Sequence, residues 1–408
     1  MRIVSVVAHV PYTGIPHAGG QYVLAHLRAL RTLGHDVTVV APDWRGNDEA
    51  ARRLRAELDV DVVVCSPGLP RPWDEWLDTQ QIRLFPVRPP RRFARAVLRS
   101  RPVREAVASG ELIEAHWTEM GWISRALRTR RRDIRRVVVA HDVIVQTYER
   151  IFATTRRWSL AWVLGLWRNR AVVRDEGRLY RGMDAVVVFS EKDARFVRGL
   201  GVRADRAVVV RPPFGGDAGA AECAPPDGPP TVVFVGAFFR DVNAQAAQWL
   251  IDGIVPLVRA RRPDVRFIMA GAGPTPAMVA AAAADPLLTV TGEVPSLEPS
   301  YASATAVVVP LLMGAGLKFK TVEALMRGIP VVSTTVGAEG LTGEGETGGL
   351  VVADEPDAIA AALLRILDDP QRAWREAQRS REWARSAFSL ETYPARLEDA
   401  LFARGERR

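Results

Sequence analysis

A run of small residues at the end of an apolar segment is the part of this sequence best suited to bind a charged ligand. Gly314, Ala315 and Gly316 separate a strand-like run from a helical pattern. Such a turn leaves the first backbone N–H groups of the helix unpaired, and the positive end of the helix dipole lies beside them. The run therefore predicts an anion-binding turn, for which a phosphate is a natural ligand.

Two lysines and a glutamate follow this turn. Lys318 and Lys320 lie at the start of the helix, where acidic residues are usually preferred, so their charge indicates an anionic ligand. The Glu323 carboxylate can accept two hydrogen bonds from a vicinal diol such as a ribose. From the residues alone, a solvated helix start is the other interpretation.

Histidines and glycines of the first half form a second set of candidates. His116 and His141 each follow a strand-like segment, so both are expected at the carboxyl end of a sheet. Gly19 and Gly20 lie between the first strand pattern and the first helical pattern, where backbone can approach a phosphate closely. Because a lone histidine or glycine pair is often structural, both interpretations stay open here.

Strand and helix patterns that could position these residues alternate twice along the chain. Ile3–Ala8 has the composition of a buried strand, Tyr22–Leu33 has helical periodicity, and Asp36–Ala41 is the next strand. This βαβ pattern predicts a parallel sheet with right-handed crossovers. A stretch rich in proline and glycine, 211–230, interrupts the alternation, which then restarts with a strand followed by a helix over about 243–261.

The predicted fold class is therefore α/β, with two Rossmann-like, doubly wound domains. Residues 1–210 form the first, 211–230 the linker and 231–387 the second, while a helix within 388–408 is expected to return to the first domain. Open parallel sheets bind ligands at the carboxyl ends of their strands, so the site is expected in a cleft where those ends face each other.

Residues 310–341 resemble the donor motif of the retaining glycosyltransferases of family 4, also called glycosyl transferases group 1, in its small-residue variant. The resemblance implies the GT-B fold, with a nucleotide sugar held mainly by the second domain. In the family's E-x7-E pair the second glutamate holds the ribose, and Glu323 matches it. Ala315 stands where the first glutamate is expected, which leaves the donor sugar open.

The diphosphate site departs from the better-known family pattern. Gly236 matches the glycine after the first strand of the nucleotide domain, but Ala237 follows it where the family has an arginine, and the family's lysine is missing. Arg240, Lys318 and Lys320 are the expected substitutes, because the leaving nucleoside diphosphate develops negative charge as the glycosidic bond breaks.

The remaining site residues are also assigned through the resemblance. Val294 lies in the loop that reads the nucleotide base, and Gly19 and Gly20 match a glycine loop over the diphosphate. His141 matches the histidine beside the donor sugar and forms the expected catalytic set with Lys320 and Glu323, while His116 is expected on the acceptor side. The family implies no metal and no cofactor beyond the nucleotide-sugar donor, with a sugar, lipid-linked or small-molecule acceptor.

Composition places the chain among globular proteins. It has 408 residues, 48% of them hydrophobic, and no apolar run approaches the roughly 18–20 residues that span a bilayer. Cys65 and Cys223 are far apart and lack partners at metal-ligand spacing, so neither a disulfide nor a zinc site is expected. A cytoplasmic location is expected.

The net charge of +8 comes from residues 1–205, whereas the rest of the chain is mildly acidic. An anionic partner of the first half would explain this, either a membrane surface at the inner face or a phosphate-bearing acceptor, and a genome that favours arginine would explain it equally. Trp158, Trp162 and Trp167 lie among arginines, which suits either a membrane-interface helix or a core helix. Aromatic–basic signatures of nucleic-acid binding are lacking.

The leading hypothesis is sugar transfer with retention, in glycan, glycolipid or natural-product glycoside synthesis. In this mechanism the departing phosphate takes the acceptor's proton, so no strong protein base is needed. A nucleotide-sugar epimerase of similar architecture would need acid and base carboxylates in the cleft, and no clear set is evident. A dinucleotide oxidoreductase is disfavoured because G-x-G-x-x-G is missing from both first turns. A non-catalytic sugar- or anion-binding protein is the remaining alternative.

Overall fold

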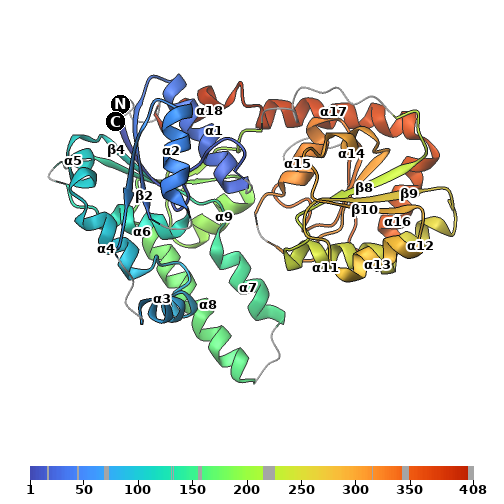
Figure 1. Cartoon of the computed structure of the whole chain (residues 1–408), viewed down its shortest axis with the longest axis horizontal. Helices are drawn as coiled ribbons and strands as arrows, with labels where there is room; N and C mark the ends of the chain where they lie inside the picture. The colour runs from blue at the N-terminus through green and yellow to red at the C-terminus, as the bar shows by residue number, and fades with distance from the viewer. Residues whose placement is uncertain are drawn as a thin grey trace. The chain divides into compact units, whose positions relative to one another are not determined.

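The computed structural model of the chain describes residues 1–15, 18–43, 46–68, 73–129, 131, 133–154, 159–214, 226–314, 316–341 and 349–402. These residues form two compact units (Figure 1). Unit 1 is Met1–Pro213 together with the chain from Thr392 onward, and unit 2 is Phe214–Glu391. Ala315, Trp158 and Cys223, which figure in the sequence predictions, lie outside the described residues.

Unit 1 contains a seven-stranded parallel sheet in the order β3-β2-β1-β4-β5-β6-β7. Its strands are β1 Arg2–Val6, β2 Asp36–Pro42, β3 Asp61–Cys65, β4 Leu112–His116, β5 Arg135–Val139, β6 Ala185–Val188 and β7 Ala207–Val209. Its helices are α1 Ala18–Thr32, α2 Asn47–Glu57, α3 Asp74–Leu84, α4 Arg91–Arg99, α5 Arg101–Ser109, α6 Thr118–Ala126, α7 Ile144–Thr154, α8 Leu160–Tyr180, α9 Glu191–Gly199 and α18 Tyr393–Leu401.

Helices cover both faces of this sheet, which explains why its strands are valine-rich rather than alternating. Residues of α1, α2 and α18 share one core cluster with β1, and residues of α4, α5 and α6 share another on the opposite face. The last helix contributes Tyr393, Leu397 and Leu401 to the first of these clusters. The predicted return of the C-terminal helix to the first domain is therefore confirmed.

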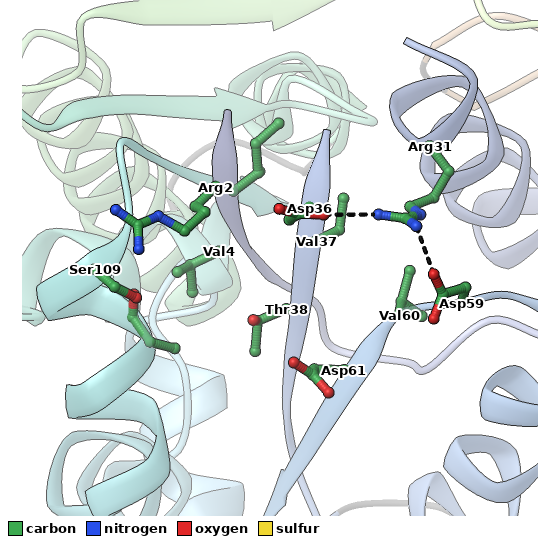
Figure 2. A pocket seen from close by; sticks show the side chains of 12 residues that line it. Arg2, Val4, Arg31, Asp36, Val37, Thr38, Asp59, Val60, Asp61 and Ser109 are labelled. Carbon is green, nitrogen blue, oxygen red and sulfur yellow. Dashed lines mark hydrogen bonds and ion pairs between the residues drawn. The ribbon is translucent and has the colours of Figure 1, made fainter. Parts of the chain in front are cut away.

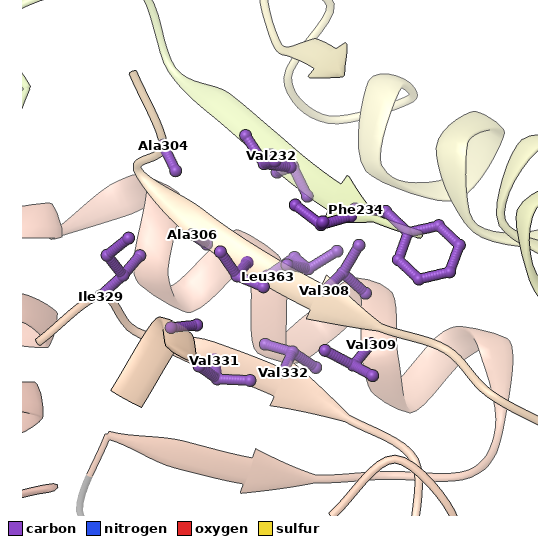
Figure 3. Close-up of a cluster of buried hydrophobic side chains, with 14 of the residues drawn as sticks. Val232, Phe234, Ala304, Ala306, Val308, Val309, Ile329, Val331, Val332 and Leu363 are labelled. Carbon is purple, nitrogen blue, oxygen red and sulfur yellow. The ribbon is translucent and has the colours of Figure 1, made fainter. Parts of the chain in front are cut away.

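Unit 2 contains a six-stranded parallel sheet in the order β10-β9-β8-β11-β12-β13. Its strands are β8 Thr231–Val235, β9 Arg266–Ala270, β10 Leu288–Gly292, β11 Ala306–Val309, β12 Val331–Ser333 and β13 Leu350–Val352. Its helices are α11 Asp241–Trp249, the π-helical η1 Leu250–Ile254, α12 Val255–Arg259, α13 Pro276–Ala284, α14 Glu298–Ala302, α15 Phe319–Met326, α16 Pro356–Asp368 and α17 Pro370–Phe388. Figure 3 shows β8, β11 and β12 contributing side chains such as Val232, Val308 and Val332 to one apolar core.

Two helices differ from the sequence prediction. Helix α1 begins at Ala18, so Gly19 and Gly20 lie in its first turn rather than in a preceding loop. Glycine suits the first of these positions because a Cβ on Gly19 would come within 2.9 Å of the Trp117 ring. The expected helix 243–261 is divided by the π-helical turn η1, which ends two residues before Pro256, a residue that cannot donate a backbone hydrogen bond.

Candidate donor and catalytic site

The strand order of each sheet reverses beside its first strand. In unit 1 the reversal lies between β1 and β4, and in unit 2 it lies between β8 and β11. Open α/β sheets bind ligands at such a switch point, outside the carboxyl ends of the strands. Most of the predicted site residues lie in the turns or helix starts that follow the strands at these two points, whereas His141 follows β5 and Val294 follows the edge strand β10.

Lys320 is the central cation of unit 2. Its ammonium donates a hydrogen bond to Asn243 Oδ1 at 2.8 Å and lies 4.8 Å from the centroid of the Phe234 ring. A Cβ built on Gly236 would stand 3.2 Å from the same ammonium. The start of α15 and the turn after β8 therefore surround one cation.

The charge of Lys320 depends on its surroundings. Burial, reinforced by the charge of Arg240, lowers the pKa of Lys320 to about 7, because removal from water penalises the ammonium form. Arg240 itself is exposed at the N-cap position of α11. Near pH 7 the Lys320 side chain is therefore only partly protonated in the free protein, and a bound anion would favour its protonated, charged form.

Glu323 lies one helical turn after Lys320. Tyr301 on α14 donates its hydroxyl to Glu323 Oε2 at 3.0 Å. Burial raises the pKa of Glu323 despite this hydrogen bond and the nearby cations Arg327 and Lys320. Arg327 in turn lies 4.3 Å from the centroid of the Tyr301 ring, so a packed group of side chains holds the carboxylate. Tyr301 lies 22 positions before Glu323, and no motif in the sequence connects the two residues.

Lys318 holds the small-residue turn together. Its ammonium bonds the carbonyl oxygen of Gly316 at 2.6 Å and pairs with the Glu339 carboxylate at 3.4 Å. Gly314, also in the turn, is half-buried, with its ideal Cβ position 3.5 Å from Lys318 Cε. Lys318 therefore stabilises the turn itself, in addition to the phosphate-binding role predicted for it.

The neighbouring turns of unit 2 pack backbone to backbone. A Cβ on Gly271 would overlap the carbonyl oxygen of Gly236, so only glycine permits this approach. Phe238 N donates to Ala272 O at 2.7 Å across the same contact. Val294, the predicted base-reading residue, is half-buried two positions after β10.

In unit 1 the predicted residues Gly19 and His141 lie together. The His141 ring stacks on Trp117 with centroids 4.3 Å apart and planes 18° apart. A Cβ on Gly19 would come within 2.9 Å of the Trp117 ring and 3.4 Å of His141 Nδ1. Gly20 is buried in the same helical turn. The first turn of α1 therefore packs closely on the His141–Trp117 stack.

Trp117, which stacks on His141, was not among the predicted residues. Its φ of 72° makes it the one non-glycine residue with positive φ among those that the structure describes. Such a conformation is strained for a bulky residue and is often kept at functional sites. Trp117 immediately follows β4 and precedes α6, so the strain lies at the switch point itself.

His116 does not lie on an acceptor surface, contrary to the prediction. It is fully buried, because alternate residues of β4 point to the face covered by α1. Its Nε2 lies 3.4 Å from Glu114 Oε1 and its Nδ1 lies 3.4 Å from His141 Nε2. Glu114 Oε2 contacts His26 Nε2 at 3.0 Å. Two polar residues at i and i+2 within a buried strand were the signal for this network.

Three of these groups are of metal-binding type. The ligand atoms of His26, Glu114 and His116 lie within 4.8 Å of one another. The prediction of no metal site considered cysteine spacing and could not detect this cluster, whose members come from α1 and β4.

A second buried carboxylate of unit 1 serves a helix end. Glu176 on α8 accepts backbone N–H groups of Ile144 and Val145 at 3.0 and 2.9 Å, and the Tyr180 hydroxyl at 2.7 Å. Burial raises the pKa of Glu176 to about 7. Its contacts identify it as the N-terminal cap of α7.

Two surface pockets of unit 1 lie away from its switch point. One, of about 370 Å³, lies at the amino ends of β1 to β3, where Arg31 pairs with Asp36 and Asp59 at 3.1 and 2.6 Å (Figure 2). The other, of about 710 Å³, adjoins the end of β3 and is lined by Asp74 and by four arginines, Arg92, Arg95, Arg99 and Arg101. Because ligands of open parallel sheets bind at the carboxyl ends of the strands, the first pocket is not the expected donor site.

Comparison with known proteins agrees with this geometry. Residues 229–369 match the family described as glycosyl transferases group 1, and residues 18–213 match the glycosyl transferase 4-like domain. The chain belongs to the group 1 glycosyltransferases, family 4. Within this family, its two parallel sheets correspond to the two domains of the GT-B fold.

Individual members of the family share part or most of this chain. The 2-deoxystreptamine glucosyltransferase of Streptomyces kanamyceticus is 31% identical over 172 residues, 41% of this chain and 43% of that protein. The chain spans less than half the length of this relative and of three others. The phosphatidyl-myo-inositol mannosyltransferase of Mycolicibacterium smegmatis is 25% identical over 88% of this group 1 chain and 84% of its own.

A solved structure shares the whole fold of this group 1 glycosyltransferase. Anabaena HepE in complex with UDP-glucose superimposes with a TM-score of 0.67 and 15% identity, over 98% of this chain and 99% of that one. At this identity the likeness concerns the fold.

Proposed function

We propose that the protein transfers a sugar from a nucleoside-diphosphate sugar to an acceptor hydroxyl, with retention of configuration. The observation that carries the proposal is the site around Lys320, where a partly neutral cation, Asn243 and the close glycine turn at Gly236 meet at a switch point. A diphosphate supplies the negative charge that this site lacks.

The two ends of the donor are assigned to different residues. Lys320 and Arg240 neutralise the diphosphate. Glu323 accepts hydrogen bonds from the ribose, while the Tyr301 hydroxyl donates to Oε2 of the same carboxylate. His141 is assigned to hydrogen bonding with the donor sugar. The departing phosphate takes the acceptor proton, so the reaction does not depend on a protein base. HepE, which shares the fold, binds UDP-glucose.

A thermal-shift panel of UDP-, GDP-, ADP- and dTDP-sugars tests the proposal. Stabilisation by one nucleotide series is expected, followed by sugar transfer when an acceptor is added. Release of free sugar or an epimer without acceptor would instead favour a nucleotide-sugar epimerase. Binding without turnover would favour a sugar- or anion-binding protein, and no stabilisation by any donor would contradict the proposed site.

We also propose that unit 1 contacts an anionic membrane surface. Trp73 and Trp76, at the start of α3, are 73% and 59% exposed, and the neighbouring pocket carries exposed Arg95 and Arg99. Exposed tryptophans beside arginines suit the headgroup region of a bilayer. Within the described residues, no helix is long and apolar enough to cross a membrane.

The other tryptophan candidates divide between the two sequence interpretations. Trp162 packs on Phe152 of α7 with ring centroids 5.7 Å apart, as expected of a core aromatic. Trp167, which lies in α8 like Trp162, is 43% exposed, and its ring makes an edge contact with the Phe85 ring. Figure 1 shows α7 and α8 side by side.

Sedimentation with vesicles tests the membrane proposal. Binding to vesicles of phosphatidylglycerol, and much less to neutral phosphatidylcholine, is expected for the full chain. Trp73→Ala/Trp76→Ala and Arg95→Glu/Arg99→Glu should each reduce it, whereas Arg261→Glu/Arg375→Glu, which changes the same charge on exposed positions of unit 2, should not. Equal loss in the two arginine variants, with none in Trp73→Ala/Trp76→Ala, would show that net charge alone is responsible and would contradict the proposed surface.

A further inference from the structure

Buried polar side chains of unit 1 form a continuous line that ends on His141. Tyr393 Oη on α18 lies 2.8 Å from His26 Nδ1, and His26 Nε2 lies 3.0 Å from Glu114 Oε2. On the other side of the carboxylate, Glu114 Oε1 lies 3.4 Å from His116 Nε2, and His116 Nδ1 lies 3.4 Å from His141 Nε2. The line connects the last helix of the chain with the predicted catalytic histidine.

Glu114 accepts from both histidines beside it. Its side chain has no exposed surface, and one imidazole nitrogen faces each oxygen. Burial alone would raise the pKa of this carboxyl, but His26 and His116 hold it well below its usual range. An ionised carboxylate can only accept hydrogen bonds, so His26 and His116 each carry a proton on Nε2.

The proton on His116 determines the state of the next ring. Burial lowers the pKa of His116, so its ring is neutral and its Nδ1 keeps a lone pair. That lone pair accepts a hydrogen bond from His141, whose own proton must therefore be on Nε2. With one proton on the ring, Nδ1 of His141, on the side of Gly19, is then the acceptor atom.

We propose that Glu114 and His116 are positioning residues that set the tautomer and orientation of His141, with α18 supporting them through Tyr393 and His26. Trp117 stacks on one side of the His141 ring, and Tyr22 packs edge-on with its centroid 5.0 Å away. A ring held by its neighbours and through Nε2 presents Nδ1 in a single direction. The inference goes beyond the proposed function and depends on it only for its effect on turnover.

A metal ion is the main competing explanation for His26, Glu114 and His116. Hydrogen bonding accounts for them more completely, because each nitrogen that faces Glu114 has its own oxygen as partner. The far nitrogen of each ring also has a partner, Tyr393 for His26 and His141 for His116. A buried line in which each polar atom already has a hydrogen-bond partner needs no ion.

Nitrogen NMR of the unmodified full chain with ¹⁵N-labelled histidine tests the hydrogen bond directly. The chain has only six histidines, and His141→Gln identifies the signals of His141. A coupling across the hydrogen bond should connect the Nε2 proton of His141 with Nδ1 of His116. A proton bonded to His116 Nδ1, a His141 protonated only on Nδ1, or one zinc ion per chain by metal analysis would overturn the proposal. None of these results requires a donor or an acceptor.

Kinetics of Glu114→Gln and His116→Phe test the consequence for turnover. We expect kcat to fall roughly 10- to 100-fold, as when an orienting partner is removed. KM for the donor should change little, because the nucleotide is assigned to Lys320 and Glu323 of unit 2. Glu176→Gln, which removes another buried carboxylate, is the matched control and should lower Tm without this loss of kcat. An unchanged kcat in Glu114→Gln would contradict the proposed positioning role.

Discussion

Lys320 and Glu323 are one helical turn apart on α15, and burial pushes both toward their neutral forms. A bound nucleoside diphosphate would favour the ammonium form of Lys320, and a bound ribose would replace water around the Glu323 carboxylate. Protonation and donor binding should therefore be coupled at the scale of these residues.

Binding of a nucleoside diphosphate should take up a proton at pH 8. The pKa of Lys320 is lowered to about 7 in the free protein, so the group is largely neutral at pH 8 and gains its proton when the anion binds. Affinity should accordingly fall as pH rises through 7, by at most about tenfold per pH unit. Calorimetry in buffers of different ionisation enthalpy measures the uptake. Lys320→Arg should bind without it, and equal uptake by both proteins would rule out Lys320 as the source.

Glu323→Ala should weaken nucleotide binding by about 1.5–3 kcal/mol, the usual range for hydrogen bonds to a charged group. The native protein should bind a deoxyribose donor more weakly than the ribose donor. Glu323→Ala should bind the two donors with nearly equal affinity. Titration calorimetry with both donors measures this difference. Glu376→Ala, a surface carboxylate of unit 2 paired with Arg372, is the control. Unchanged donor affinity in Glu323→Ala would remove this residue from the ribose site.

At the scale of elements, the site depends on turns that touch without intervening side chains. The first turn of α1 packs on Trp117 through Gly19, and the turn after β9 packs on the turn after β8 through Gly271. In both places the missing side chain sets the distance between two elements. The effect of filling such a contact should appear in activity before it appears in the fold.

Gly19→Ala should reduce kcat while leaving most of the stability intact. The new methyl group would meet the Trp117 ring at 2.9 Å and displace the stack with His141, whereas alanine itself favours the helix over glycine by roughly 1 kcal/mol. Gly199→Ala, at the end of α9 with no atom within 4 Å of the new Cβ, is the matched control. Steady-state kinetics and thermal unfolding measure the two effects. Full activity in Gly19→Ala would show that the stack is not needed.

At the scale of the whole molecule, the two units are connected in the sequence more than once. The chain leaves unit 1 after Pro213, forms unit 2, and returns at Thr392 to complete unit 1 with α18. Two segments of the C-terminal part of the chain therefore stabilise different cores. Leu363 is buried in the core of unit 2 and Leu397 in that of unit 1.

Leu397→Ala should destabilise unit 1 by about 2–5 kcal/mol, the usual cost of a large cavity in a core. Leu363→Ala should have a similar effect on unit 2. Differential scanning calorimetry with and without nucleotide distinguishes them, because ligand stabilises the unit that binds it. One unfolding transition should move to higher temperature when nucleotide is added. Leu363→Ala should lower the temperature of that transition, and Leu397→Ala should not. The opposite assignment would place the nucleotide in unit 1.

Much of the architecture could be predicted from the sequence. The parallel sheets, the returning helix and the group 314–323 follow from local patterns, because periodicity and turn residues act within a few positions along the chain. The same limit explains the errors. The start of α1 and the π-helical turn before Pro256 depend on packing and hydrogen bonds that the patterns do not encode.

The tertiary structure alone decided which predicted residues meet, and what lies behind them. Lys320 and Asn243 are 77 positions apart, His26 and Glu114 are 88 apart, and His26 and Tyr393 are 367 apart. Such contacts depend on the order of the strands and on which face of β4 its side chains occupy. For this reason His116 changed from an expected acceptor contact to a buried neighbour of His141. The sequence determined which chemical groups are present and which elements hold them, whereas packing across the sheet determined their partners and their charge.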